Sequence, residues 1–137
     1  MAGWAWGWGW AWAYGAALLV IGALDALWLG VLAKDFYRSE MVDVAAADVR
    51  LVPAVLFYLA YPAGLMALAL VPAPDSLPGA VLRAALVGLV AYATYDLTNM
   101  ATLKQWSWGL ALTDTVWGTF ISAAAGGAAY WTLKRLA

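Results

Sequence analysis

Three aspartates stand inside stretches of sequence that are otherwise apolar, and they are Asp25, Asp96 and Asp114. A charged side chain near the middle of a bilayer costs at least about 2.5–3.5 kcal/mol, so acids in membrane-spanning segments face the protein interior and usually have a function. Carboxyl groups in such a position can carry a proton, bind a ligand or cation, or take part in acid–base chemistry. These three residues are therefore the first candidates for a functional site.

Polar side chains accompany Asp96 at helical spacing. Tyr92 precedes it by four residues and Asn99 follows it by three, so all three share one face of a helix. Tyr95 lies on the neighbouring stripe. Asp96 thus has the most polar neighbours within its own segment, and we expect it to be the most important of the three acids.

A tryptophan follows each of the other two aspartates by three residues, pairing Asp25 with Trp28 and Asp114 with Trp117. In a helix this spacing puts the indole one turn from the carboxylate and on the same face. The indole N–H can then donate to the acid of its own helix or to an acid on a facing helix.

The composition indicates where these residues act. Of the 137 residues, 66% are apolar and 11% are charged, whereas soluble chains have about 45–50% and about 25%. The chain has no Cys and no His, which excludes disulfides, thiolate or imidazole metal sites and Ser-His-Asp triads. A net charge of −1 gives no case for binding nucleic acid.

Four stretches are long and apolar enough to cross a bilayer, since about 20 helical residues span roughly 30 Å of hydrocarbon. They cover about residues 12–33, 51–71, 79–102 and 109–133. The alternation of a membrane β-barrel is absent from the sequence, and an open sheet cannot satisfy its backbone in lipid. The sequence therefore predicts an all-α fold with one transmembrane domain over residues 1–137, an integral membrane four-helix bundle with short connections.

Counting along the predicted helices puts the three acids at one depth. Asp25 lies nine residues before Lys34, Asp96 lies eight before Lys104, and Asp114 lies ten after Lys104. At 1.5 Å per residue, each acid is roughly 12–15 Å from the same membrane face.

Further residues reach the level of the three acids. The second span starts at this same membrane face, and its residues Tyr58 and Tyr61 lie at a depth similar to that of the three acids. Three like charges in a low-dielectric interior cannot all be ionised, so at least one or two should be neutral at pH 7. Lys104 or Arg50 can neutralise another by reaching inward from the membrane face. The candidate residues of a ligand or ion site are Asp25, Trp28, Tyr58, Tyr92, Tyr95, Asp96, Asn99, Lys104, Asp114 and Trp117.

The links between the spans are short and differ in character. Residues 34–50 hold most of the charge and can form a short interfacial helix around the alanines at 45–47. Residues 72–78 contain three prolines, which end one helix and open the next. Residues 104–108 are few enough to make the third and fourth spans an antiparallel pair.

The N-terminal segment is expected to anchor the protein at the membrane interface, but the basic residues do not determine which way the protein is oriented in the membrane. Five tryptophans alternate with Ala and Gly between residues 4 and 12, and we expect residues 1–11 to form a helical interfacial anchor rather than a strand. A flat ligand stacked on these indoles is the alternative. Four spans put both termini on one side, with three basic residues there and four on the other. The positive-inside rule therefore leaves both a single and a dual orientation open.

Three kinds of function are compatible with the buried polar residues. The first is a site that binds or transports a small ligand, an ion or a proton. Against it stand plain interhelical hydrogen bonding and an oxygen-lined site for a hard metal, although no spaced motif demands a metal. The second is a membrane enzyme or accessory subunit acting on lipid or an isoprenoid, with no residue assigned as catalytic. The third is a structural partner of a membrane complex.

Blocks of the sequence resemble a known family. They are residues 24–30 (Leu-Asp-Ala-Leu-Trp-Leu-Gly) with 33–37, residues 88–104, and residues 114–119 (Asp-Thr-Val-Trp-Gly-Thr). Over about residues 16–133 the chain is similar to a bacterial family of small predicted membrane proteins, domain of unknown function 2177. The Trp-rich start departs from the family's usual short basic start. The resemblance implies a multi-pass, four-helix protein of the inner membrane without an assigned reaction or cofactor. The lipid bilayer is its expected partner, a homo-oligomer stays open, and no nucleic acid is expected.

Overall fold

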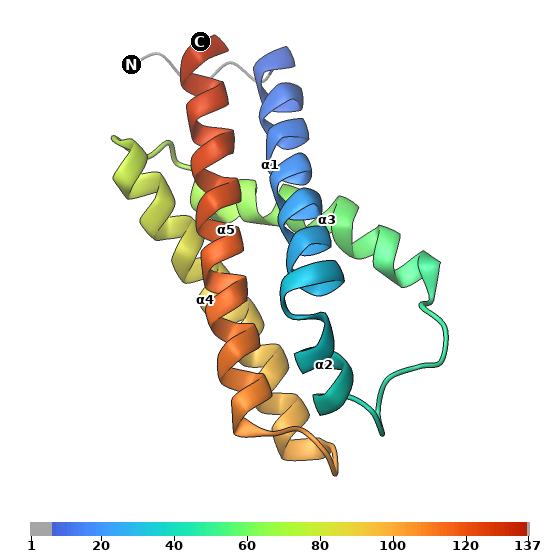
Figure 1. Cartoon of the computed structure of the whole chain (residues 1–137). Helices are drawn as coiled ribbons and strands as arrows, with labels where there is room; N and C mark the ends of the chain where they lie inside the picture. Colours follow the sequence, from blue (N-terminus) through green and yellow to red (C-terminus); the bar gives the residue numbers. More distant parts are fainter. Residues whose placement is uncertain (1–6, 137) are drawn as a thin grey trace.

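The regular structure of this protein is entirely helical in the computed structural model, which describes residues 7–136. The first long helix, α1 (Trp8–Leu27), continues directly into a π-helical turn, η1 (Trp28–Leu32). The other helices are α2 (Lys34–Glu40), α3 (Leu51–Ala69), α4 (Leu77–Thr102) and α5 (Trp108–Leu136) (Figure 1). The all-α prediction is confirmed.

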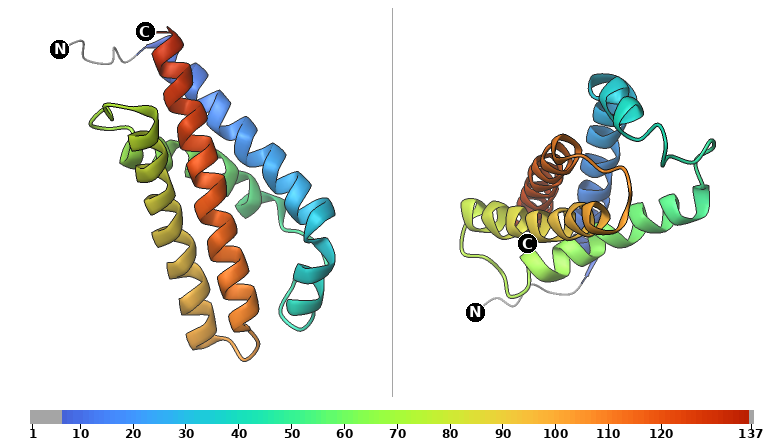
Figure 2. Two further views of the ribbon diagram at one scale, coloured as in Figure 1. Left: turned by 60° about the vertical axis from the view of Figure 1, so that its left-hand side comes forward. Right: turned by 90° about the horizontal axis from the view of Figure 1, so that it is seen from below.

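Three helices lie lengthwise together, and α3 lies across them. The antiparallel helices α4 and α5 share the most extensive contact, and α1 packs along α5. α3 crosses the others obliquely and contacts chiefly α1 and α4 (Figure 2). The arrangement therefore differs from the regular four-helix bundle that the sequence predicts.

The burial pattern of α3 explains its oblique position. Its buried residues are Pro62, Leu65, Met66 and Ala69. All four belong to the second half of the helix, so that half packs most closely against the other helices. The first half carries exposed apolar side chains, Val52 and Leu56 among them, and projects away from the other helices (Figure 1).

Hydropathy distinguishes three of the four predicted spans. Within the described residues, the segments Trp8–Leu32, Leu51–Ala69 and Leu77–Thr102 are long and apolar enough to cross a membrane. α5 has 29 residues and is the longest helix, but polar residues and glycines interrupt its apolar sequence. It is also the helix with the most buried residues, because α4 and α1 both pack against it.

Small residues occupy every fourth position at the contact between α4 and α5. They are Ala80, Ala84 and Gly88 on α4, and Gly118, Ser122 and Gly126 on α5. A methyl group added at Gly126 would lie only 2.2 Å from Cβ of Ala84, and one at Gly88 would lie 2.5 Å from the carbonyl oxygen of Gly118. The two backbones therefore approach as closely as small residues allow, which is the usual basis of helix association in membranes.

Two of the three predicted links are confirmed, and one is corrected. Ser76 caps α4 by accepting a hydrogen bond from the Gly79 N–H (3.2 Å), with a proline in the first turn. The short α4–α5 loop makes an antiparallel pair. The helix predicted around residues 45–47 is wrong, because the short helix is α2. There Asp35 in the first turn and Arg38 in the last turn complement the helix dipole.

The tryptophan-rich segment is helical from Trp8, where α1 begins. Trp8 and Trp12 are 84% and 66% exposed, so they face outward. Trp10 and Tyr14 lie on the opposite side and pack against the hydrophobic core. The remainder of the predicted anchor, residues 1–6, lies outside the described residues.

Candidate functional site

Along the buried faces of α1, α4 and α5, small or apolar residues give way to polar ones toward one end of the molecule. On α1 the buried residues Ala13, Ala17 and Ile21 lead to Asp25 at intervals of four. On α4, Tyr92 follows Gly88, the last small residue of the contact, by four residues. On α5, Asp114 precedes Gly118, the first small residue of the contact, by four residues. Larger polar side chains at one level keep the helices from closing there. α1 also separates from α5 toward this end (Figure 2, left).

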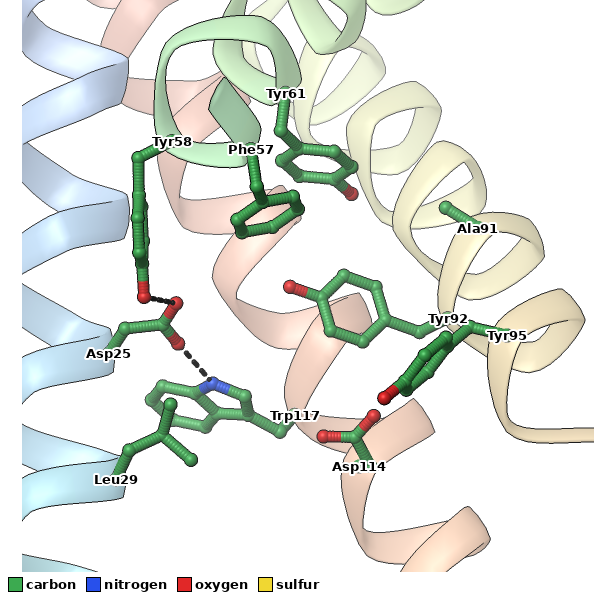
Figure 3. Close-up of a pocket in the computed structure, with 10 residues that line it drawn as sticks. All are labelled: Asp25, Leu29, Phe57, Tyr58, Tyr61, Ala91, Tyr92, Tyr95, Asp114 and Trp117. Carbon is green, nitrogen blue, oxygen red and sulfur yellow. Dashed lines mark hydrogen bonds between the residues drawn. The ribbon is translucent and has the colours of Figure 1, made fainter. Parts of the chain in front are cut away.

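A cavity of about 430 Å³ lies at this level, between α1, α3, α4 and α5. Ten residues line it, and all ten appear in Figure 3. Two of these described residues are carboxylates, Asp25 and Asp114, and none is basic. The aromatic lining residues are Phe57, Tyr58, Tyr61, Tyr92, Tyr95 and Trp117. A mostly apolar cavity with a few convergent polar groups is typical of a small-molecule site.

Asp25 is held by donors from two other helices. The Tyr58 hydroxyl on α3 donates to its Oδ2 (2.8 Å), and the Trp117 indole N–H on α5 donates to its Oδ1 (2.9 Å). Only 6% of Asp25 is exposed. Both donors are neutral, so they fix the orientation of the carboxyl group without supplying an opposite charge (Figure 3).

Asp114 is held by a relay that begins on η1. The Trp28 indole N–H donates to the Tyr37 hydroxyl (3.3 Å), and that hydroxyl donates to Asp114 Oδ1 (2.8 Å). The Trp28 ring also stacks on Trp117, with 4.5 Å between centroids and 9° between planes. The tryptophan of each Asp-Trp pair is therefore hydrogen-bonded toward the acid of the other pair. Trp117 donates to Asp25 directly, and Trp28 is linked to Asp114 through Tyr37.

The π-helical turn η1 begins at Trp28, directly after α1 and three residues after Asp25. It is closed by the Ala33 N–H, which donates to the Trp28 carbonyl oxygen (2.7 Å). The wider turn changes the rotation of the residues that follow, and Leu29 within it lines the cavity. π-Helical turns inside α-helices frequently mark functional sites.

Asp96 lies beside this arrangement and is fully buried. The Trp106 indole N–H donates to its Oδ1 (3.2 Å), and the Thr115 hydroxyl donates to its Oδ2 (3.3 Å). Its carboxyl group is also within hydrogen-bonding reach of the Asp114 carboxyl group. Asp96 and Asp114 are therefore direct neighbours across the contact between α4 and α5.

Tyr92 presents its hydroxyl to the cavity (Figure 3). Its ring rests on the backbone at Gly118, where an added methyl group would lie 2.0 Å from Cγ of the ring. The hydroxyl makes no hydrogen bond to any of the residues that the structure describes. The nearby Tyr61 hydroxyl, by contrast, is bonded to Ser122 Oγ (2.6 Å). Tyr92 is therefore a lining tyrosine with a hydroxyl available to a ligand.

Six of the ten predicted site residues line the cavity, namely Asp25, Tyr58, Tyr92, Tyr95, Asp114 and Trp117. Trp28 lies behind Trp117, and Asp96 lies beside Asp114. Asn99 is within hydrogen-bonding reach of Tyr95. Lys104 is exposed in the α4–α5 loop and forms no ion pair within residues 7–136.

The structure adds residues that sequence reasoning left out of the site. Leu29, Phe57, Tyr61 and Ala91 complete the cavity wall. Tyr61 could have been included, because it follows Tyr58 by one helical turn and lies on the same face of α3. Tyr37 had no such signal, since it belongs to α2 and reaches Asp114 only through the fold.

Tyr37 is the titratable part of the relay that lies outside the membrane-spanning segments. Burial raises the pKa of the Tyr37 hydroxyl above its usual value, the hydrogen bond from Trp28 lowers it, and the Asp114 carboxylate raises it further. The net direction is upward, so the hydroxyl stays protonated and remains a donor to Asp114 over the whole physiological range.

Comparison with known proteins bears on the membrane assignment. A family model described as a predicted membrane protein (DUF2177) matches residues 10–131. This match confirms the resemblance seen in the sequence blocks. No curated protein and no solved structure matches the chain.

Proposed function

The chain belongs to the DUF2177 family of predicted membrane proteins, and from that premise we propose that it is a four-span protein that binds or transports a small ligand, ion or proton. The observation that carries the proposal is the cavity of about 430 Å³ at which two carboxylates and four tyrosines converge. A multi-pass position in the inner membrane is part of the same proposal.

The burial of α5 supports a fourth crossing. α5 has 29 residues, which at 1.5 Å per residue gives a length of about 43 Å. It packs between α4 and α1, so its Thr, Ser and Gly residues are largely shielded from lipid. A span sheltered in this way needs fewer large apolar side chains than one that faces lipid.

The shape of the site favours ligand binding over interhelical hydrogen bonding alone. Hydrogen bonds that only join helices need contact between the helices, whereas these polar side chains surround open space. The volume also falls within the range of small-molecule sites, about 300–1,000 Å³. The Tyr92 hydroxyl, which has no partner among the described residues, is a donor or acceptor that a ligand can use.

A cavity-filling variant tests this proposal. Ala91 lines the cavity from α4, whereas Ala67 on α3 is exposed and serves as the matched control. The purified full chain is incubated with a small-molecule extract of the host cells, washed, and its retained molecules are identified by mass spectrometry. We expect the wild type and Ala67→Phe to retain a ligand that Ala91→Phe does not.

Transport is measured with the retained ligand in proteoliposomes that contain a pH-sensitive dye. Ligand-dependent proton movement by the wild type, reduced in Ala91→Phe, is the expected result. The proposal fails if the wild type retains nothing that Ala91→Phe loses. Conversion of the ligand to a product would favour the membrane-enzyme alternative, and co-purification with another membrane protein without ligand would favour a structural role.

A further inference from the structure

We propose that the ligand of this cavity is a small organic cation, an amine or quaternary ammonium compound with an apolar body. The inference rests on the proposed function, because it assumes that the cavity binds a ligand. It is drawn from the charge of the cavity, its aromatic wall and its size.

The charge of the cavity favours a positive partner. Asp25 and Asp114 both line it, and none of the ten lining residues is Lys or Arg. Within residues 7–136, neither carboxylate has an ion-pair partner, and the groups that bond them are Tyr58, Trp117 and Tyr37, all neutral. A carboxyl group that stays ionised away from water needs a compensating charge. A cationic ligand supplies the charge that the protein lacks.

The aromatic wall suits a cation with an apolar surface. Six of the ten lining residues are aromatic, and a cation over the face of Trp, Tyr or Phe is attracted by the ring quadrupole. Phe57 and Tyr61 stack at 5.3 Å between centroids, and Tyr92 meets the edge of Tyr61 at 6.0 Å. These contacts fix the rings, so the wall is formed before a ligand arrives.

The same features disfavour other ligand classes. Within the described residues no group of three or more acidic side chains could hold a metal ion. A phosphate or other anion would meet two carboxylates and no basic residue. A neutral lipid chain would leave both carboxylates uncompensated, and a proton alone would not need a cavity of about 430 Å³.

Isothermal titration of the purified full chain tests the ligand class. The probes are tetramethylammonium, choline and benzyltrimethylammonium, and the neutral comparison is 3,3-dimethylbutan-1-ol, which matches choline in shape but has no charge. We expect at least one cation to bind saturably and the neutral alcohol to bind at least about tenfold more weakly than choline.

Variants connect the binding to the cavity. We expect Asp25→Asn and Asp114→Asn each to weaken cation binding by about tenfold or more, since each removes a charge at nearly constant volume. Asp75→Asn, at an exposed acid in the α3–α4 turn, should bind like the wild type. Thermal melts of all variants identify any that fail to fold. Tyr92→Phe then provides a further test of binding, because the Tyr92 hydroxyl makes no hydrogen bond to a described residue that its removal could break.

The outcomes separate this inference from the proposed function. Equal binding of choline and the neutral alcohol, lost in Ala91→Phe, would overturn the cation class and leave the cavity as a binding site. Retention of a neutral or anionic molecule from the extract, with no binding of any cation, would have the same meaning. If no cation binds and no extract molecule depends on Ala91, both proposals fall.

Discussion

Hydrogen bonding at the cavity connects helices rather than residues of the same helix. Trp117 lies one turn from Asp114 in the sequence, yet its N–H donates to Asp25 on α1. Trp28 lies one turn from Asp25, yet it reaches Asp114 through Tyr37. Each carboxyl group is therefore oriented by side chains of at least one other helix, which ties its geometry to the packing of the whole site.

Asp96 tests whether a buried acid outside the cavity wall affects function. Asp96→Leu leaves the donors of Trp106 and Thr115 without an acceptor, and we expect a loss of about 1–3 kcal/mol for each. Asp96→Asn keeps an acceptor, so we expect a nearly unchanged thermal melt in detergent. The same variant removes the titratable group beside Asp114, and we expect it to weaken ligand retention.

That expectation makes Asp96 a positioning residue that acts through Asp114. The comparison of Asp96→Asn with Asp96→Leu separates its structural part from its functional part. Full ligand retention by Asp96→Asn, together with an unchanged melt, would show that the residue only joins helices.

Tyr37 provides a prediction that depends on pH. Because its pKa is raised in the folded protein, its contribution to stability is complete below pH 10, where an exposed tyrosine begins to titrate. The contribution is lost as pH rises through the higher folded value. We expect the absorbance change near 295 nm around pH 10 to be the same in the wild type and in Tyr37→Phe. A smaller change in the variant would show that the Tyr37 hydroxyl titrates normally.

At the scale of the elements, the α4–α5 pair supports one wall of the cavity. Its small residues bring the two backbones together, and the pair then carries Tyr92 and Asp114 at the level where the small residues end. The geometry of the site therefore depends on glycines that do not touch the cavity.

Gly118→Ala tests this dependence. The added methyl group would lie 2.0 Å from the Tyr92 ring, so the ring must move. We expect destabilisation of about 1–3 kcal/mol from overpacking and weaker ligand retention. Gly15→Ala on α1, where no atom lies within 4 Å of the new methyl group, is the matched control and should be neutral or slightly stabilising. Equal thermal melts and ligand retention for the two variants would contradict the role of Gly118.

At the scale of the molecule, the proposed four crossings would place the two chain termini on the same side of the membrane. The chain contains no cysteine, so single cysteines at exposed positions report sidedness directly. Ala73 lies in the α3–α4 turn, Gln105 in the α4–α5 loop and Leu136 at the end of α5.

We expect Ala73→Cys and Leu136→Cys to react with a membrane-impermeant maleimide to the same extent. The fraction of Gln105→Cys that reacts should equal the fraction of the other two variants that stays unreacted. This holds whether the protein inserts in one orientation or in two. If Leu136→Cys follows Gln105→Cys instead, α5 does not cross the membrane and the four-span proposal is wrong.

Local physics made much of the fold predictable from the sequence. Helix was the prediction for every long apolar stretch, because a backbone in lipid must satisfy its own hydrogen bonds. The depth of Asp25 and Asp114 followed from the rise per residue, and both line one cavity. The prolines and the short α4–α5 loop also act through their neighbours in the chain, so these turns were predictable.

Tertiary packing alone decided how those elements meet. The rotation of each helix selects which donor faces which acid, so Trp117 reaches Asp25 and α2 brings Tyr37 to Asp114. The oblique course of α3 goes with a burial pattern in which all its buried residues lie in its second half. None of these contacts lies between residues near one another in sequence, and their energies depend on several helices at once. The sequence by itself determined the helices and the common level of Asp25 and Asp114; only the packing of those helices against one another decided that these two acids line one cavity.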